Sequence, residues 1–271
     1  MDLQTLQTFY DRPPAEAAAD ARWPEAHKAL LIGLESGVIR SAQPDGDGDW
    51  RVHSWVKQAI LAGFRASKMV ELPGALFPFI DKTAFPARVF SVEDGIRMVP
   101  GGSSVRRGSF ISPGVTVMPP AFINMGAFVD EGTMVDSHAL VGSCAQIGKR
   151  VHLSAAAQLG GVLEPAGARP VIVEDDAFVG GLAGVFEGVR VRRRAVLASG
   201  VVLTASTVIY DLVNEREWTR DVPEGAVVVP GSRPARGAFA EGRGLQLATA
   251  LIVKYRDSRT DAATALESAL R

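Results

Sequence analysis

The sequence predicts a parallel β-helix of hexapeptide repeats, and two observations indicate this fold. Aliphatic residues recur at every sixth position in two phased runs, a period that matches neither an α-helix nor an alternating strand. The fourth residue after most of them is Ala, Val or Thr, which suits a narrow interior. The first run is Ile111, Val117, Ile123, Val129, Val135, Val141, Ile147, Leu153 and Leu159, and the second is Val173, Val179, Val185, Val191, Leu197, Leu203 and Ile209. Because one repeat cannot bury its aliphatic residue alone, the repeats must stack.

The repeats also predict how the coil turns. Three of them make one triangular coil, so residues eighteen apart are expected to stack. Several residues that directly follow an aliphatic position are Asn, Asp or Gly, types that tolerate tight corners, and we place the corners there. These residues are Asn124, Asp130, Asp136, Gly142, Gly148, Gly160 and Gly180. The period does not fix the handedness, for which the general crossover rule favours a right-handed coil.

The N-terminal region, residues 1–95, has a different texture, and we expect a small α-rich domain there. Residues 23–37 read as a helix with Gly37 near its C-terminus, and residues 54–65 as a second helix begun by Ser54.

We place the β-helix at residues 96–214, with a loop near 164–170, and a third region at 215–271. In this last region, residues 226–230 and 247–255 read as strands, followed by a short helix from about Thr260. These strands are expected to close the end of the coil, because an uncovered edge invites aggregation.

Composition indicates a cytoplasmic enzyme subunit. The chain of 271 residues has a net charge of −1, which argues against a nucleic-acid partner. Its longest basic run, Arg190 with 192–194, is expected to be a solvated face. No apolar run is long enough to span a membrane, and the N-terminus lacks a signal-peptide core. The single cysteine, Cys144, excludes a disulfide framework or a thiolate metal cluster within one chain.

Several segments carry a specific resemblance that covers essentially the whole chain. INMGAFVDEGTMVDSHALVGSCAQIGKRVHLS (123–154) and GGVLEP (160–165) resemble the signature of the tetrahydrodipicolinate N-succinyltransferases of the diaminopimelate and lysine pathway. HSWVKQAILAGFR, GIRMVP (95–100), VPEGAVVVPG and ALIVK extend the match. The resemblance implies a left-handed β-helix and a homotrimer with active sites between subunits. It also implies succinyl transfer from succinyl-CoA to the amino nitrogen of ring-opened tetrahydrodipicolinate, without a metal.

Two residues are the main candidates for that chemistry. Arg97 in GIRMVP matches the family's substrate-binding arginine, and a guanidinium suits an acceptor with two carboxylates. Asp136 in TMVDSH matches the family's active-site aspartate, which would take the proton of the attacking amine. The alternative for each is structural, a surface ion pair for Arg97 and turn chemistry for Asp136. Asp130, one repeat earlier, is expected to serve the turn alone.

One departure from the family puts the remaining chemistry in question. Many members have an ARSEVVEG-like segment whose first glutamate has a catalytic role, whereas this chain has GGLAGVFEG with Gly184 at that place. Glu187 matches the second glutamate and is a further catalytic candidate. Two explanations stay open: Asp136 alone suffices as the base, or the donor is acetyl-CoA or the acceptor a related amino-dicarboxylate. Leu182 and Ala183 replace the Arg and Ser of the segment, which also leaves recognition of the donor open.

Other polar residues have weaker claims. Ser143 and Ser154 are candidate donors to the substrate. Backbone groups at small corner residues are expected to hold the pantetheine arm of coenzyme A, and a lysine near the C-terminus its phosphates. These candidates are Ala198, Ser199, Gly200 and Lys254. His138 is a less favoured base, His152 is interpreted as a corner histidine bonded to backbone, and Cys144 as a buried thiol.

Two other classes of β-helix protein fit the sequence less well. A zinc enzyme of the γ-carbonic anhydrase kind needs three histidines from stacked coils, whereas the predicted coil has only His138 and His152, which are fourteen apart rather than eighteen. A purely structural β-helix would not need the DEGTMVD and GSCAQIG blocks, which depart from simple repeats. The sequence therefore favours an acyl-CoA-dependent N-acyltransferase.

Overall fold

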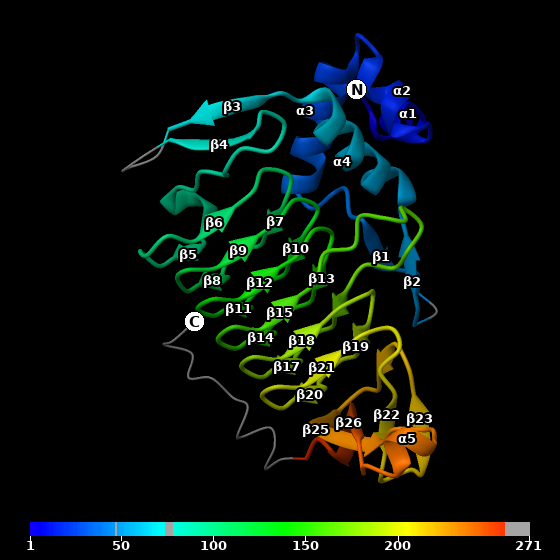
Figure 1. Ribbon diagram of the computed structural model, residues 1–271. Helices are drawn as coiled ribbons and strands as arrows, with labels where there is room; N and C mark the ends of the chain where they lie inside the picture. The colour runs from blue at the N-terminus through cyan, green and yellow to red at the C-terminus, as the bar shows by residue number, and fades with distance from the viewer. Residues whose placement is uncertain (47, 74–77, 258–271) are drawn as a thin grey trace.

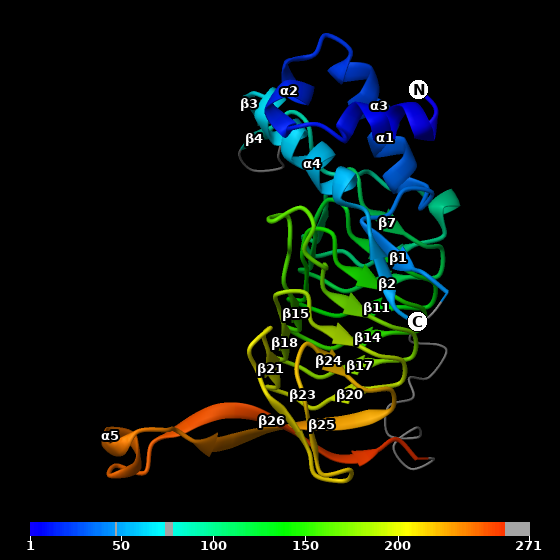
Figure 2. The same cartoon turned by 90° about the vertical axis from the view of Figure 1, so that its right-hand side faces the viewer.

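The computed structural model describes residues 1–46, 48–73 and 78–257. A helical bundle lies at one end of the molecule, a triangular β-helix forms its body, and a two-stranded arm projects from the other end (Figures 1 and 2). The order along the molecule therefore follows the order along the chain.

The N-terminal helices pack around one apolar core. They are α1 (Leu3–Tyr10), α2 (Pro14–Ala19), α3 (Trp23–Glu35) and α4 (Ser54–Ala66). Both predicted helices are confirmed, although α3 ends two residues before Gly37, which adopts a positive φ of 74°. Ser54 is the first helical residue rather than the cap, a place taken by His53.

Two short hairpins accompany these helices and were not predicted from the sequence. The first pairs β1 (Ala42–Pro44) with β2 (Trp50–Val52), and the second pairs β3 (Met69–Leu72) with β4 (Phe79–Lys82). Strands of three or four residues are too short to show an alternating pattern. The β1–β2 hairpin leaves the helical end and lies along the coil (Figure 2). A short 3₁₀ helix, η1 (Val92–Asp94), precedes the coil.

The coil consists of three parallel sheets built from two-residue strands, which we name after β11, β12 and β13. The β11 sheet contains β5 (Arg97–Met98), β8 (Thr116–Val117), β11 (Met134–Val135), β14 (His152–Leu153), β17 (Phe178–Val179) and β20 (Val196–Leu197). The β12 sheet contains β6 (Ser104–Val105), β9 (Phe122–Ile123), β12 (Leu140–Val141), β15 (Gln158–Leu159), β18 (Gly184–Val185) and β21 (Val202–Leu203). The β13 sheet contains β7 (Phe110–Ile111), β10 (Phe128–Val129), β13 (Gln146–Ile147), β16 (Ile172–Val173), β19 (Arg190–Val191) and β24 (Asp221–Val222).

The predicted register is confirmed. Val135 pairs with Val117 and Leu153, each eighteen residues away. The predicted loop near 164–170 lengthens one coil, so that Ile147 pairs with Val173. All the predicted interior aliphatic residues are buried in one continuous core.

The corners differ from the prediction. The residue with positive φ stands three places after the interior aliphatic residue, at Gly108, Gly114, Gly126, Gly132, His138, Cys144, Arg150, Ala156, Asp176, Leu182, Gly188, Arg194 and Gly200. The Asn and Asp residues directly after the aliphatic position instead accept a hydrogen bond from the next backbone N–H, as Asp136 does from Ser137. The side chains of Asn124, Asp130 and Asp136 are thus held locally at the start of their corners.

The end of the coil is closed as predicted. Its elements are β22 (Ile209–Asp211), β23 (Arg216–Trp218), β25 (Ala226–Pro234), α5 (Ala238–Glu241) and β26 (Gln246–Tyr255). Strand β25 continues the β11 sheet by pairing with β20, and Val228 and Ile252 extend the coil core. The outer half of the β25–β26 hairpin projects with α5 at its tip (Figure 2). The helix predicted from Thr260 lies outside the described residues.

Candidate functional site

The corner between the β11 and β12 sheets, here called the β11–β12 edge, collects several of the predicted residues. Asp136, Ser154 and Ala198 each directly follow a strand of the β11 sheet. The N–H of Asp136 donates to the carbonyl of Leu153 and that of Ser154 to the carbonyl of Val179, both at 2.9 Å. The structure therefore stacks Asp136, Ser154 and the corner at 198–200 along one edge.

The Asp136 carboxylate is anchored by one oxygen. Its Oδ1 accepts a hydrogen bond of 2.7 Å from the N–H of Ser137, and its Oδ2 lies 4.0 Å from Nε2 of His152. The Asp136 side chain is 31% exposed and that of His152 is 12% exposed. A carboxylate held in this way can accept a proton from a group that approaches the edge.

His152 is not the corner histidine that the sequence suggested. It lies in β14, one residue before the interior Leu153, and so on the outer face of the β11 sheet. Its ring packs edge-on against Phe178, with centroids 4.9 Å apart. Its place directly before an interior aliphatic residue was the signal that could have shown this.

Arg97 lies on the same outer face. It pairs with Thr116, followed along the sheet by Met134 and His152. At about 4.8 Å per strand, Arg97 and His152 are about 14 Å apart along the sheet. Arg97 is exposed, on the face that ends at the Asp136 corner.

Glu187 and Ser143 lie elsewhere, at the corner between the β12 and β13 sheets. The Oε2 of Glu187 accepts a hydrogen bond of 3.0 Å from the N–H of Ala205, and Glu187 lines a cleft of about 730 Å³ beside the loop. Ser143 is buried, with Oγ 3.5 Å from Sδ of Met125. Within one chain, neither residue can act beside Asp136.

The ring of Phe186 explains how Gly184 is accommodated. A Cβ at Gly184 would lie 2.4 Å from Cε2 of Phe186, and one at Gly160 would lie 2.7 Å from its Cδ1. The ARSEVVEG segment has Glu and Val where this chain has Gly184 and Phe186. The bulky ring thus takes the space in which a glutamate side chain would begin.

The residues predicted to contact coenzyme A lie in two separate places. Ser199 and Gly200 are exposed on the β11–β12 edge, and Leu182 beside them is 73% exposed. Lys254 lies in β26, in register with Val227, and its Nζ is 3.8 Å from Oδ1 of Asp257. It is therefore placed at the closed end of the coil rather than at the Asp136 corner.

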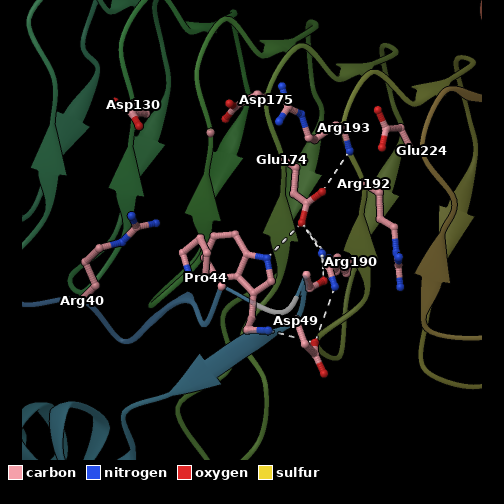
Figure 3. A pocket seen from close by; sticks show the side chains of 14 residues that line it. Arg40, Pro44, Asp49, Asp130, Glu174, Asp175, Arg190, Arg192, Arg193 and Glu224 are labelled. Atoms are coloured by element: carbon pink, nitrogen blue, oxygen red, sulfur yellow. Dashed lines mark hydrogen bonds and ion pairs between the residues drawn. The ribbon is translucent and has the colours of Figure 1, made fainter.

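A second charged cleft of about 480 Å³ lies where the β1–β2 hairpin meets the corner between the β13 and β11 sheets (Figure 3). The prediction that Arg190 is solvated is wrong, because the hairpin covers it and leaves it 5% exposed. Arg190 contacts Glu174 at 2.6 Å and the carbonyl of Gly48 at 2.8 Å, and Trp50 also donates to Glu174. A buried charge must be paired, and these contacts of Arg190 and Glu174 with Gly48 and Trp50 anchor the hairpin to the coil.

Three further candidates have simple outcomes. His138 is exposed at the β11–β12 edge, with a φ of 62°. Cys144 is fully buried, and burial raises the pKa of its thiol to about 11, as expected of an inert thiol. Across residues 1–46, 48–73 and 78–257, His, Cys, Asp and Glu side chains form no group of three suited to a metal ion. None of the helices in these ranges has the length and apolar character needed to cross a membrane.

Comparison with known proteins gives consistent matches. Residues 5–66 match the model described as tetrahydrodipicolinate N-succinyltransferase N-terminal, and residues 170–205 the hexapeptide repeat of succinyl-transferase. The chain is 42% identical over 282 residues to the 2,3,4,5-tetrahydropyridine-2,6-dicarboxylate N-succinyltransferase of Nitrobacter hamburgensis, covering 100% of both chains. It is 45% identical over 253 residues to the enzyme of that name from Bradyrhizobium diazoefficiens, covering 91% of this chain and 89% of that protein.

A solved structure supports the fold. A Campylobacter jejuni chain described as a 2,3,4,5-tetrahydropyridine-2-carboxylate N-succinyltransferase superposes with a TM-score of 0.58 at 15% identity. The match covers 89% of this chain and 64% of that chain. The coil is thus of the left-handed type of hexapeptide-repeat acyltransferases. The right-handed rule concerns crossovers that pack a helix back onto twisted strands, whereas this coil connects two-residue strands by tight corners.

Proposed function

The chain belongs to the tetrahydropyridine-2,6-dicarboxylate N-succinyltransferase family, and from this premise we propose that it transfers a succinyl group from succinyl-CoA to ring-opened tetrahydrodipicolinate. This reaction is a step of diaminopimelate and lysine biosynthesis. The observation that carries the assignment to a site is the stacking of Asp136, Ser154 and the corner at 198–200 on one edge of the coil.

In the proposed mechanism, Asp136 accepts the proton of the attacking amine. The amine nitrogen bonds to the thioester carbonyl carbon, and its proton passes to the carboxylate. The C–S bond then breaks, and the coenzyme A thiolate leaves and takes up the proton. The products are the N-succinyl compound and free coenzyme A, so atoms and charges balance.

The other candidate residues bind and orient the substrates. Arg97 pairs with a carboxylate of the acceptor, as its exposed guanidinium on the adjoining face allows. Ser154 donates to the acceptor, and backbone groups at 198–200 hold the pantetheine arm. Lys254, which is half-exposed at the closed end of the coil, contacts the phosphates of coenzyme A.

We also propose a cytoplasmic homotrimer with active sites between subunits. The outer face of the β12 sheet carries Phe122 beside Leu140 and, beyond Gln158 and Gly184, Val202, which is 52% exposed. Exposed apolar side chains on a flat sheet face suit a subunit interface. Glu187 and Ser143 lie at the corner between the β12 and β13 sheets of their own chain. In a trimer, they would therefore join the Asp136 of a neighbouring chain.

Acetyl-CoA is the second candidate donor. The apolar Leu182 lies exposed beside the corner at 198–200, where the family segment has an arginine that could pair with the distal carboxylate of a succinyl group. The test is a thiol-release assay with each donor, using tetrahydrodipicolinate and L-2-aminopimelate as acceptors. We expect kcat/KM to be at least about tenfold higher with succinyl-CoA. Equal or faster turnover with acetyl-CoA would assign the other donor, and no thiol release with either would remove the proposed function.

A further inference from the structure

His152 lies beside Asp136, and the mechanism proposed above gives this histidine no role. Nε2 of His152 is the atom that faces the carboxylate, at 4.0 Å from Oδ2. The carboxylate is held from the other side, because its Oδ1 already accepts the N–H of Ser137. A small rotation about the side-chain bonds of Asp136 would bring the two atoms within hydrogen-bond distance.

The ring of His152 is fixed by the coil itself. Along the outer face of the β11 sheet, its register neighbours are Met134 on one side and Phe178 on the other. The ring meets Phe178 edge-on, at an interplanar angle of 67°. With only 12% of the side chain exposed, the imidazole is placed by packing and does not depend on solvent for its orientation.

Neither of the two positions that match the family's glutamates places a carboxylate beside Asp136. Gly184 has no carboxylate to offer, and Glu187 is held at another edge by the N–H of Ala205. His152 is in contrast one register step from Met134, whose strand leads directly into Asp136.

We propose that His152 is a positioning residue for Asp136, which it holds in the orientation that accepts the amine proton. This role rests on the proposed function. The imidazole donates its Nε2–H to Oδ2 of Asp136 and thereby fixes the plane of the carboxylate. Each carboxylate oxygen has a second lone pair, so the carboxylate can still take the proton of the incoming amine. The histidine itself exchanges no proton with the substrate.

The test separates positioning from packing by a pair of variants. His152→Phe keeps a ring beside Phe178 but removes the donor, whereas His152→Gln keeps an N–H donor near the place of Nε2. We expect His152→Phe to lower kcat by about 10- to 100-fold with both KM values within about threefold. His152→Gln should recover most of that loss. Thermal melting of each variant shows whether it is folded.

A double-mutant cycle with Asp136→Asn completes the experiment. If His152 acts through Asp136, His152→Phe should change kcat by less than about threefold in the Asp136→Asn background. An equal loss in both backgrounds, or a folded His152→Phe enzyme with unchanged kcat, would overturn the inference. If His152→Phe fails to fold, His152→Leu, which also lacks the donor, takes its place in the same cycle, with the same expected result and the same contrary outcome. Wild-type thiol release reports on the proposed function separately.

Discussion

Asp130 and Asp136 occupy the same place in successive repeats, and their comparison shows what the repeat determines. Each follows an interior valine, and each accepts a hydrogen bond from the next backbone N–H, at 2.8 Å and 2.7 Å. Asp130 lines the cleft under the β1–β2 hairpin, where Arg40 also lies (Figure 3). Asp136 instead faces His152 on the open β11–β12 edge. The repeat sets the backbone of both corners, and the side chains that surround each corner set its use.

The sharpest way to break this comparison is to neutralise both carboxylates in turn. Asp136→Asn keeps an oxygen for the Ser137 N–H but cannot accept the amine proton, so kcat should fall by about 10²- to 10⁴-fold. Asp130→Asn is the matched control and should keep kcat within about threefold. Steady-state thiol release, with light scattering to verify the assembly, gives both values. Similar losses in the two variants would mean that the edges are not functionally distinct.

Substitutions in the cleft under the β1–β2 hairpin should lower the stability of the protein rather than its kcat. Arg190→Met leaves Glu174, whose side chain is 12% exposed, without its ion-pair partner, which typically costs about 3–5 kcal/mol of unfolding free energy. We expect a correspondingly lower urea midpoint, while kcat of the folded fraction stays near the wild-type value. A large drop in kcat at unchanged stability would assign catalytic work to this edge.

Arg97 tests how far the active edge extends along the β11 sheet. Arg97→Ala removes the charge proposed to pair with a substrate carboxylate, so the acceptor KM should rise by about 10- to 100-fold, with a smaller change in kcat. Arg97→Lys keeps the charge without the bidentate geometry, so its acceptor KM should lie between those of the wild type and Arg97→Ala. An acceptor KM that matches the wild type in Arg97→Ala would refute the pairing.

Gly184 and Phe186 offer a smaller effect on the β12 sheet. Gly184→Glu places a Cβ against the ring of Phe186, and such overpacking costs about 1–3 kcal/mol. Adding Phe186→Val, which restores the residue pair of the family segment, should recover most of that loss in thermal or urea unfolding. Additive losses in the double variant would show that the two positions are independent.

Cys144 should give the smallest effect. It is fully buried and its thiol has a raised pKa, so it should not react with a thiol reagent in the native enzyme. Cys144→Ser should keep kcat within about twofold. Rapid labelling of the native protein, or a large loss in the serine variant, would place the thiol in the reaction.

The sequence predicted the interior of the coil because the stacking of the repeats itself produces the six-residue period. Each interior residue such as Val135 must point inward, so a six-residue interval with eighteen-residue pairing follows. The repeats also allow a prediction that Asp136 and Glu187 lie at different corners. Val135, Leu153 and Val179 stack on one sheet, whereas Val185, which precedes Glu187, belongs to the next repeat and so to the next sheet.

Other features depend on contacts that no local pattern shows. Arg190 is buried only because residues near Asp49, far earlier in the chain, fold over it. The positive φ at His138 and Cys144 comes from the closure of the coil, which overrides the usual preference for glycine. Likewise the contact of His152 with Asp136 arises from stacking between coils.

The most direct measurement is a crystal structure of the enzyme with coenzyme A and L-2-aminopimelate bound. The amine nitrogen is expected within about 3.2 Å of the Asp136 carboxylate, with Arg97 on an acceptor carboxylate and the pantetheine arm along 198–200. An acceptor bound in the cleft lined by Asp130 and Arg40, or one whose amine is far from Asp136, would contradict the assignment of the reaction to the β11–β12 edge.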